Sequence, residues 1–265
     1  MEQEAFVNVA AASSDSIWLP PPERLTLDSG AVHVWLASLD HSPSQVSHFQ
    51  DTLAADERSR ASRFYFRHDR ERFIVARGVL RAILGRYLYR APESLAFHYS
   101  FHGKPALVSE SGVETIRFNI SHSHGTALYV VTRGREIGVD LELIRNGLAI
   151  EQIAERFFSR REVSALFALP TELRQRAFFL CWTRKEAYIK ARGEGLSLPL
   201  DQFDVSLIPG EPAALLSTQP DPDEALRWSL QELALASGYA AAFAVKARCC
   251  SLSCWQWPAP LRCNT

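Results

Sequence analysis

Lysine and methionine are scarce in this sequence, which holds four lysines and 25 arginines among its 29 basic residues, and a single methionine. Long apolar runs are absent as well. The stretch from Tyr239 to Val245 is far shorter than the ~20 residues that a helix needs to cross a bilayer. The chain begins Met-Glu-Gln-Glu, which is acidic where a secretory signal is basic. These features predict a cytoplasmic protein with neither a membrane span nor a membrane partner.

Cysteine is also sparse, with five residues. Cys181 stands alone, and the other four crowd the C-terminus without C-x-x-C spacing: Cys249, Cys250, Cys254 and Cys263. They could form a zinc site, but no histidine follows His124 to complete one. The sequence therefore predicts reduced cysteines and no metal at this end of the chain.

The composition is that of an ordinary globular protein, with 47% hydrophobic and 22% charged residues in 265. This length fits one large domain or two smaller ones. The net charge is −1, yet ten arginines lie between Arg58 and Arg90. Such a basic stripe on a neutral protein attracts anionic ligands. Nucleic acid is one such partner, but the chain has no helix-turn-helix, RNP or zinc-finger pattern, so no nucleic-acid partner is predicted.

The pattern of apolar residues divides the chain into an irregular leader (1–30), two halves (31–145 and 146–248) and a cysteine-containing tail (249–265). In the first half, alternation predicts a strand over 31–39, and an apolar stripe predicts one long helix over 55–88. Short alternating runs separated by glycines then predict an antiparallel sheet from strands at 95–99, 106–108, 117–121, 127–132 and 137–143.

The second half begins with helices. Ser159 and Glu162 have the spacing of a capping box. A longer helix is predicted over 171–192, between Pro170 and Gly193, which suit a helix start and a helix end. Strands follow at 203–207, 226–233 and 239–247. The order of elements predicts an α+β fold with two comparable halves.

Two carboxylates lie close together in the run Ile-Gly-Val-Asp-Leu-Glu-Leu. Asp140 and Glu142 are two residues apart, so in a strand they point to the same face. Val139 and Leu141 then occupy the opposite face, which fits a core. Like charges this close favour a cation such as Mg²⁺ between them. The alternative is a solvated face of the sheet, and the pair alone leaves both possibilities open.

The second long helix carries an acid and a base one turn apart. Glu186 and Lys190 are at positions i and i+4, which are neighbours on one helix face. An isolated pair of this kind is usually a surface ion pair of little energetic value. Together with Asp140 and Glu142, however, Glu186 would supply a third carboxylate for a cation, and Lys190 would suit a phosphate oxygen.

Polar residues end one of the predicted strands in the run Phe-Asn-Ile-Ser-His-Ser-His-Gly. Ser121, His122 and Asp140 could suggest a catalytic triad, but no G-x-S-x-G elbow surrounds Ser121. This turn is either a phosphate pocket, with His122 as the cation, or an ordinary polar turn. Lys104, in the turn His-Gly-Lys-Pro, would add to the positive field of the arginine-rich helix.

Several blocks of the sequence resemble those of the 4′-phosphopantetheinyl transferases of the surfactin-synthetase-activating type. The main signature is Gly-Val-Asp-Leu-Glu at 138–142 followed by Trp-Thr-Arg-Lys-Glu-Ala-Tyr-Ile-Lys at 182–190. Further blocks match in the same order, at 63–65, 102–105, 118–123, 156–159 and 195–200. The resemblance covers about residues 31 to 246 and leaves out the leader and the tail.

This resemblance implies two similar α+β halves related by a pseudo-twofold axis, with coenzyme A and Mg²⁺ in the cleft between them. Asp140, Glu142 and Glu186 would hold the Mg²⁺ that also binds the pyrophosphate of coenzyme A. Glu186, directly or through a water, would take the proton from a serine hydroxyl of a carrier protein. Lys190 would stabilise the pyrophosphate and the departing 3′,5′-ADP.

The resemblance also implies where the nucleotide binds and which partners the protein has. Arg60, Arg67, Lys104 and His122 would receive the 3′-phosphate and the nucleotide, and Ser121 would line the pocket. The partners would be apo acyl carrier or peptidyl carrier proteins, and the internal pseudo-dimer would let a monomer suffice. The alternative is a non-catalytic module that binds coenzyme A or carrier proteins.

Overall fold

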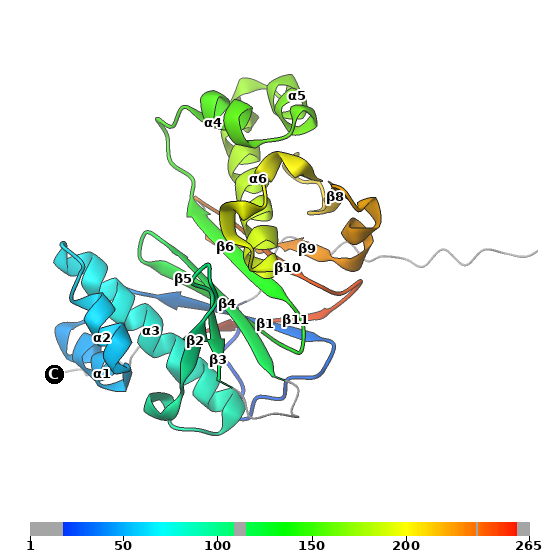
Figure 1. The fold of residues 1–265 in the computed structure, drawn as a ribbon. Helices are drawn as coiled ribbons and strands as arrows, with labels where there is room; N and C mark the ends of the chain where they lie inside the picture. The colour runs from blue at the N-terminus through cyan, green and yellow to red at the C-terminus, as the bar shows by residue number, and fades with distance from the viewer. Residues whose placement is uncertain (1–17, 109–114, 237, 259–265) are drawn as a thin grey trace, which may run out of the picture.

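The computed structural model describes residues 18–108, 115–236 and 238–258 and consists of two main sheets with helices packed on them (Figure 1). The larger sheet has the order β11 (Ser251–Gln256), β1 (Ala31–Ser38), β5 (Thr126–Arg133), β4 (Ile116–Ser123). The smaller, antiparallel sheet has the order β6 (Ile137–Leu143), β10 (Tyr239–Val245), β9 (Ser229–Glu232). Two hairpins pair β2 (Phe97–Tyr99) with β3 (Pro105–Leu107) and β7 (Phe203–Val205) with β8 (Leu215–Thr218).

The helices fall into two groups. The first half carries α1 (Pro43–Thr52), α2 (Ala55–Ala61) and α3 (Arg67–Leu88), and the second half carries α4 (Ile150–Phe157), α5 (Arg160–Ala168) and α6 (Thr171–Arg192). Short 3₁₀ helices lie at η1 (Pro92–Ser94), η2 (Gly195–Ser197), η3 (Leu200–Gln202) and η4 (Pro222–Arg227). Both α3 and α6 are 22 residues long and each packs against one sheet. This confirms the predicted α+β fold with two similar halves.

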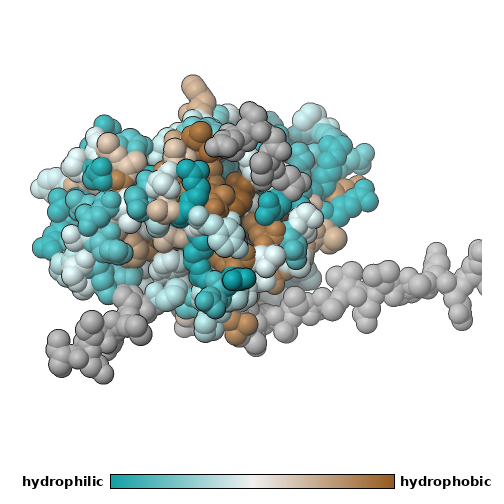
Figure 2. Space-filling view, turned by 90° about the horizontal axis from the view of Figure 1, so that it is seen from below, coloured by the Kyte–Doolittle hydropathy of each residue, from teal (hydrophilic) through white to brown (hydrophobic). Residues whose placement is uncertain are grey.

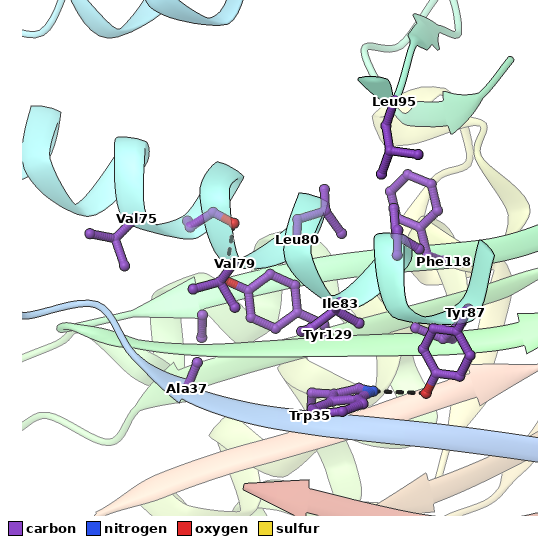
Figure 3. Close-up of a cluster of buried hydrophobic side chains, with 14 of the residues drawn as sticks. Trp35, Ala37, Val75, Val79, Leu80, Ile83, Tyr87, Leu95, Phe118 and Tyr129 are labelled. Atoms are coloured by element: carbon purple, nitrogen blue, oxygen red, sulfur yellow. Dashed lines mark hydrogen bonds between the residues drawn. The ribbon is translucent and has the colours of Figure 1, made fainter. Parts of the chain in front are cut away.

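The apolar stripe of α3 covers one face of the larger sheet (Figure 3). Val79 and Ile83 of this helix belong to the same buried cluster as Trp35 of β1 and Tyr129 of β5. Two hydrogen bonds fix the ends of the contact: the indole of Trp35 donates to the Tyr87 hydroxyl at 2.9 Å, and the Tyr129 hydroxyl donates to the carbonyl of Ala76 at 3.1 Å. The stripe predicted from the sequence is therefore the face that α3 buries.

In the second half, α6 lies directly against β6 and β10. Close approach is possible because β6 contains Gly138, where a Cβ atom would collide with the backbone of Ala187 and Ala191. The helix begins after Pro170 and ends at Gly193, which adopts a left-handed conformation with φ 72°. The capping box of Ser159 and Glu162 starts α5. These boundaries confirm the helix signals of the sequence.

A third apolar cluster lies between the two sheets and joins the halves. It brings Val32 and Val130 of the larger sheet together with Val139, Leu141 and Phe243 of the smaller one. Seen from below, apolar residues gather in a band near the middle of the molecule, with hydrophilic residues on both flanks (Figure 2). Within the described ranges, no helix combines the length and apolar character that crossing a bilayer requires.

The single helix predicted over 55–88 is wrong. The chain forms α2 and α3 instead, and Phe66, the residue before α3, is extended with φ −86° and ψ 134°. Glu57 explains the break, because it reaches back to the amide of Ala54 at 2.9 Å and pairs with Arg77 and Arg81 of α3 at 2.5 and 2.6 Å. These contacts hold α2 against α3, which a continuous helix would prevent.

The pairing of the strands also differs from the predicted border between the two halves. β6, which the sequence analysis placed in the first half, hydrogen bonds with β10, so the change from one sheet to the other falls before residue 137 rather than near 145. The sequence predicts no strand in the cysteine-containing tail, yet its residues 251–256 form β11, parallel to β1, where Trp35 pairs with Trp255. Leu19 of the leader bridges to Trp255 on the other side. β8 was also missed, while Cys263 lies outside the described residues.

Candidate active site

Four charged side chains meet where α6 packs on β6. Because the strand alternates, Val139 and Leu141 point into the core between the sheets, and Asp140 lies on the other face, against Lys190 of α6. Glu142 and Glu186 are close enough to Asp140 for their charges to interact. The same-face placement of Asp140 and Glu142, predicted from their spacing, agrees with this geometry.

Asp140 is the centre of this group. It is 3% exposed, and its Oδ1 accepts hydrogen bonds from Lys190 Nζ at 2.5 Å and from Ser121 Oγ at 3.0 Å. Lys190 Nζ also donates to Ser121 Oγ at 3.1 Å. The other carboxylate oxygen, Oδ2, is buried and has no protein partner. A buried carboxylate oxygen without a partner costs free energy, so this atom marks a place that suits a cation or a hydrogen-bond donor.

Burial and mutual repulsion raise the pKa of two of the carboxyls. For Glu186 the causes are loss of solvent and the charges of Asp140 and Glu142, with Lys190 acting in the opposite direction. For Glu142 they are loss of solvent and Asp140, while the hydrogen bond from Ser123 and the charge of Lys190 oppose the rise in pKa. A divalent cation would relieve this crowding of negative charge.

The three carboxylates are neighbours but are not gathered into a complete ligand set. Among the residues that the structure describes, no group of three or more His, Cys, Asp or Glu side chains is arranged to hold a metal ion. Oδ1 of Asp140 is taken by Lys190 in this arrangement. The chemistry of the donors and the unpartnered Oδ2 fit Mg²⁺. The assignment of Asp140, Glu142 and Glu186 as its ligands stays a prediction.

A cavity of about 250 Å³ opens beside these groups, between the two halves. Glu186, Ile189 and Lys190 line it from α6, and Asn119 and Lys104 line it from the first half. A second cavity, of about 650 Å³, shares Gly103 with the first and is lined by Arg60, Arg63, Phe64 and Tyr99 among others. The two cavities are thus neighbours at Gly103, and Glu186 is the site carboxylate that lines the smaller one.

His122 lies in a strongly positive environment. Although the residue is exposed, neighbouring protein atoms partly desolvate the ring and lower its pKa, and the positive charges of Lys190, Arg60 and Arg72 lower it further. Arg72 is held in place by Asp40, with contacts of 2.7 and 3.2 Å. The positive charge of Lys190, Arg60 and Arg72 around a neutral imidazole that can still donate a hydrogen bond suits a phosphate. Sequence reasoning named His122 and Arg60 but missed Arg72, because the periodicity of α3 does not show which arginines face the turn after β4.

Arg67, the other arginine chosen from the helix, is not brought to this region. It forms an ion pair with Glu71 at 2.7 Å, its side chain is 70% exposed, and it lines a separate hollow beside α1. Arg77 and Arg81 are buried against Glu57. The arginine-rich stripe is therefore divided among structural, solvent-facing and cavity-lining roles rather than forming one binding face.

Lys104 reaches the cleft, but its ammonium group is engaged by the backbone. Nζ donates to the carbonyl oxygens of Ile137, Lys190 and Ala191 at 3.0, 2.6 and 3.2 Å. Burial lowers the pKa of Lys104 to about 8. In this structure Lys104 therefore ties the end of α6 to β6, and its role toward a 3′-phosphate stays a prediction.

Sequence comparisons agree with this architecture. Residues 136–244 match the sequence model described as the 4′-phosphopantetheinyl transferase superfamily, and residues 38–135 match that of the 4′-phosphopantetheinyl transferase N-terminal region. The two matches meet at the turn before β6, where the sheets change. The chain belongs to the 4′-phosphopantetheinyl transferase superfamily.

Individual relatives extend the match. The chain is 44% identical over 228 residues to the 4′-phosphopantetheinyl transferase HetI of Nostoc sp., covering 86% of this chain and 93% of the relative. It is 32% identical over 166 residues to the 4′-phosphopantetheinyl transferase Sfp of Bacillus subtilis, covering 63% and 71%. The solved holo-[acyl-carrier-protein] synthase of Thermotoga maritima aligns with 43% of this chain and 63% of its own at 19% identity, with a TM-score of 0.35 that is too low to add to the assignment.

Proposed function

We propose that this protein transfers the 4′-phosphopantetheine group of coenzyme A to a serine of apo acyl or peptidyl carrier proteins, with Mg²⁺, and releases 3′,5′-ADP. The observation that carries the proposal is the meeting of Asp140, Glu142, Glu186 and Lys190 beside a cavity between the two halves. The names of the relatives support the same reaction.

The reaction moves a phosphoryl centre from a pyrophosphate to an alcohol. A bond forms between the serine oxygen and the β-phosphorus of coenzyme A, the bond from that phosphorus to the bridging oxygen breaks, and 3′,5′-ADP departs with the electron pair. Such transfers depend mainly on charge neutralisation and on orientation of the hydroxyl. A cation held by the three carboxylates, together with Lys190, would neutralise the charge, and a carboxylate at the cleft can orient the hydroxyl.

The residues divide these tasks between them. Asp140, Glu142 and Glu186 would hold Mg²⁺, which when bound neutralises charge on the pyrophosphate. Glu186 accepts the serine proton, directly or through a water, and its raised pKa suits a general base. Lys190 donates hydrogen bonds to the pyrophosphate and stabilises the leaving 3′,5′-ADP.

The nucleotide end of coenzyme A would lie toward the basic region. His122 and Arg60, together with Arg72, form a positive environment that suits the 3′-phosphate. Ser121 lies between this region and Asp140. Lys104 and Arg67 are the weaker parts of the predicted set, because Lys104 is bound to three carbonyls and Arg67 lies in another hollow.

The alternative is a module that binds coenzyme A or a carrier protein without catalysis. A binder has no need of a general base, so the presence of Glu186 beside Asp140 and Lys190 favours an enzyme. Incubation with coenzyme A, Mg²⁺ and apo carrier proteins of several classes tests the proposal. We expect the carrier to gain the mass of one phosphopantetheine. Binding of coenzyme A with no mass change on any carrier would favour the module instead. A cytoplasmic location and a monomeric state stay predictions.

A further inference from the structure

The edge of β6 that faces away from β10 is bound by side chains rather than by another strand. The pairing with β10 uses even-numbered residues, as shown by the bond from the amide of Ile144 to the carbonyl of Gly238 and that from Lys246 to the carbonyl of Glu136. In an antiparallel strand the remaining amides point to the opposite edge. Those of Val139, Leu141 and Leu143 therefore face away from β10.

Each of these three amides donates to a side chain of β4. Val139 donates to Asn119 Oδ1 at 3.0 Å, Leu141 to Ser121 Oγ at 3.3 Å, and Leu143 to Ser123 Oγ at 3.2 Å. The acceptors on β4 are two residues apart, and so are the amides on β6. Because both strands have the same rise per residue, each acceptor stays opposite its amide. We call this row of three side chains, Asn119, Ser121 and Ser123, the edge row.

The edge row is buried, so the loss of any of its hydrogen bonds would cost free energy. Its three members are 5, 6 and 8% exposed, and Val139 and Leu141 are 0 and 1% exposed. A buried amide that loses its acceptor costs the desolvation penalty of that group, so β6 would shift rather than leave three amides unpaired. In the described part of the chain, β4 pairs with β5 and offers β6 its side chains as acceptors.

The same side chains reach the carboxylates. Ser123 Oγ accepts from Leu143 and also donates to Glu142 Oε2 at 3.2 Å. Ser121 Oγ accepts from Leu141 and donates to Asp140 Oδ1 at 3.0 Å. One hydroxyl thus fixes both the backbone and the acidic side chain beside it, which couples the position of β6 to the direction of its carboxylates.

We propose that Asn119 and Ser123 are positioning residues that hold β6 in register across the junction of the two sheets and thereby place Asp140 and Glu142 for their ligand. This inference rests on the proposed function for the nature of the ligand. Asn119 also lines the smaller cavity, but the role proposed for Asn119 and Ser123 is exerted through the backbone of β6 and, for Ser123, through the carboxylate of Glu142.

Two variants and two controls test the proposal in the full-length protein. Ser123→Ala removes the bonds of the hydroxyl to Leu143, Glu142 and His124, and Ser123→Thr keeps the hydroxyl. Asn119→Ala removes one acceptor without touching a carboxylate. Thr132→Val is the matched control, because the Thr132 hydroxyl is also buried in the same sheet but donates to the carbonyl of Ala31 in β1 at 2.9 Å. The readouts are amide hydrogen exchange by NMR and the dissociation constant of Mn²⁺, used as a probe cation, by calorimetry.

We expect Ser123→Ala to speed amide exchange at Leu143, and Asn119→Ala to speed it at Val139, each by about tenfold or more. Both variants should also bind Mn²⁺ about tenfold more weakly, as is usual when a residue supporting a metal ligand is lost. Ser123→Thr should restore both values, and Thr132→Val should change neither. The apparent KM for Mg²⁺ should rise in the two alanine variants more than kcat falls.

Normal exchange and normal Mn²⁺ affinity in both alanine variants would overturn the proposal, and so would faster exchange with unchanged Mn²⁺ affinity. If Ser123→Ala does not fold, Asn119→Ala and Ser123→Cys carry the same comparison. If the wild-type protein binds no Mn²⁺, the proposed metal site fails. The exchange rates then decide separately whether the edge row holds β6.

Discussion

Replacing Glu186 by glutamine is the most direct test of the proposed reaction, because it removes the charge and the base while keeping the size of the side chain. Glu186 lines the cavity between the halves, one helical turn from Lys190. If it accepts the serine proton, its loss should lower the single-turnover rate by about 10²–10⁴-fold, the usual contribution of a general base. The affinity for coenzyme A should change much less.

The pH dependence of the rate follows from the environment of Glu186. Burial raises its pKa above the ordinary value of 4.5, and the charges of Asp140 and Glu142 add to the rise. A general base works only when it is deprotonated. The wild-type rate should therefore increase with pH as Glu186 loses its proton and then level off, and Mg²⁺ held by the same carboxylates should move this rise to lower pH. Glu186→Gln should lack this limb of the profile.

The same raised pKa predicts an effect on stability. An acid whose pKa is higher in the folded state stabilises the fold below its unfolded pKa, near 4.5, and that contribution is lost as pH rises through the folded pKa. At neutral pH the ionised Glu186 is therefore a net cost to metal-free protein. Glu186→Gln should raise the melting temperature at neutral pH, and the gain should vanish as the pH falls below the unfolded pKa.

The assay measures transfer to an apo carrier protein by mass spectrometry under single-turnover conditions, with Mg²⁺ present and coenzyme A affinity measured separately by calorimetry. Glu194→Gln is the matched control, since Glu194 follows the same helix but pairs with Arg192 at 2.5 Å. A near-normal rate for Glu186→Gln would refute the assignment of the base. Glu186 would then be only a charged neighbour of Asp140 and Lys190 without a role in proton transfer.

Four further substitutions test other parts of the structure. Lys190→Ala should lower both the single-turnover rate and the affinity for coenzyme A, measured as above, because a lysine on the pyrophosphate acts in the ground state as well as in the transition state; an effect on the rate alone would contradict this role. His122→Ala should weaken coenzyme A more than 3′-dephospho-coenzyme A in calorimetry, whereas Arg67→Ala should weaken neither; equal losses for the two ligands would place His122 away from the 3′-phosphate. Glu57→Ala should destabilise the fold by about 3–5 kcal/mol in denaturant unfolding, because it leaves the buried Arg77 and Arg81 without their carboxylate. A loss below about 1 kcal/mol would show that these arginines find other partners.

The parts of the site that the sequence could predict are those set by local geometry. Strand alternation places Asp140 and Glu142 on one face, and helical spacing places Glu186 next to Lys190. Pro170 and Gly193 mark the ends of α6 correctly because these residues fit helix termini for reasons of their own backbone conformation. None of these inferences needs a contact between distant segments.

The parts that could not be predicted depend on partners far away in the chain. Periodicity shows that the arginines near α3 lie on a helix, but Arg81 is buried because Glu57, 24 residues earlier, meets it across the break between α2 and α3. Lys104 looks like a free cation in a turn until α6, 86 residues later, brings the carbonyl of Lys190 to it.

The edge row shows the same limit in a more informative way. A two-residue spacing of polar side chains in the block 118–123 is visible in the sequence, and alone it indicates a strand with one polar face. The role of these side chains depends on three amides of β6 that point away from β10. They are available to side chains because β6 lies at the edge of its own sheet. The polar face of β4 is buried, at 5–8% exposure, because those amides need acceptors. Polar residues that alternate along a strand next to an acidic motif are therefore candidates for fixing that motif, as well as for binding its ligand.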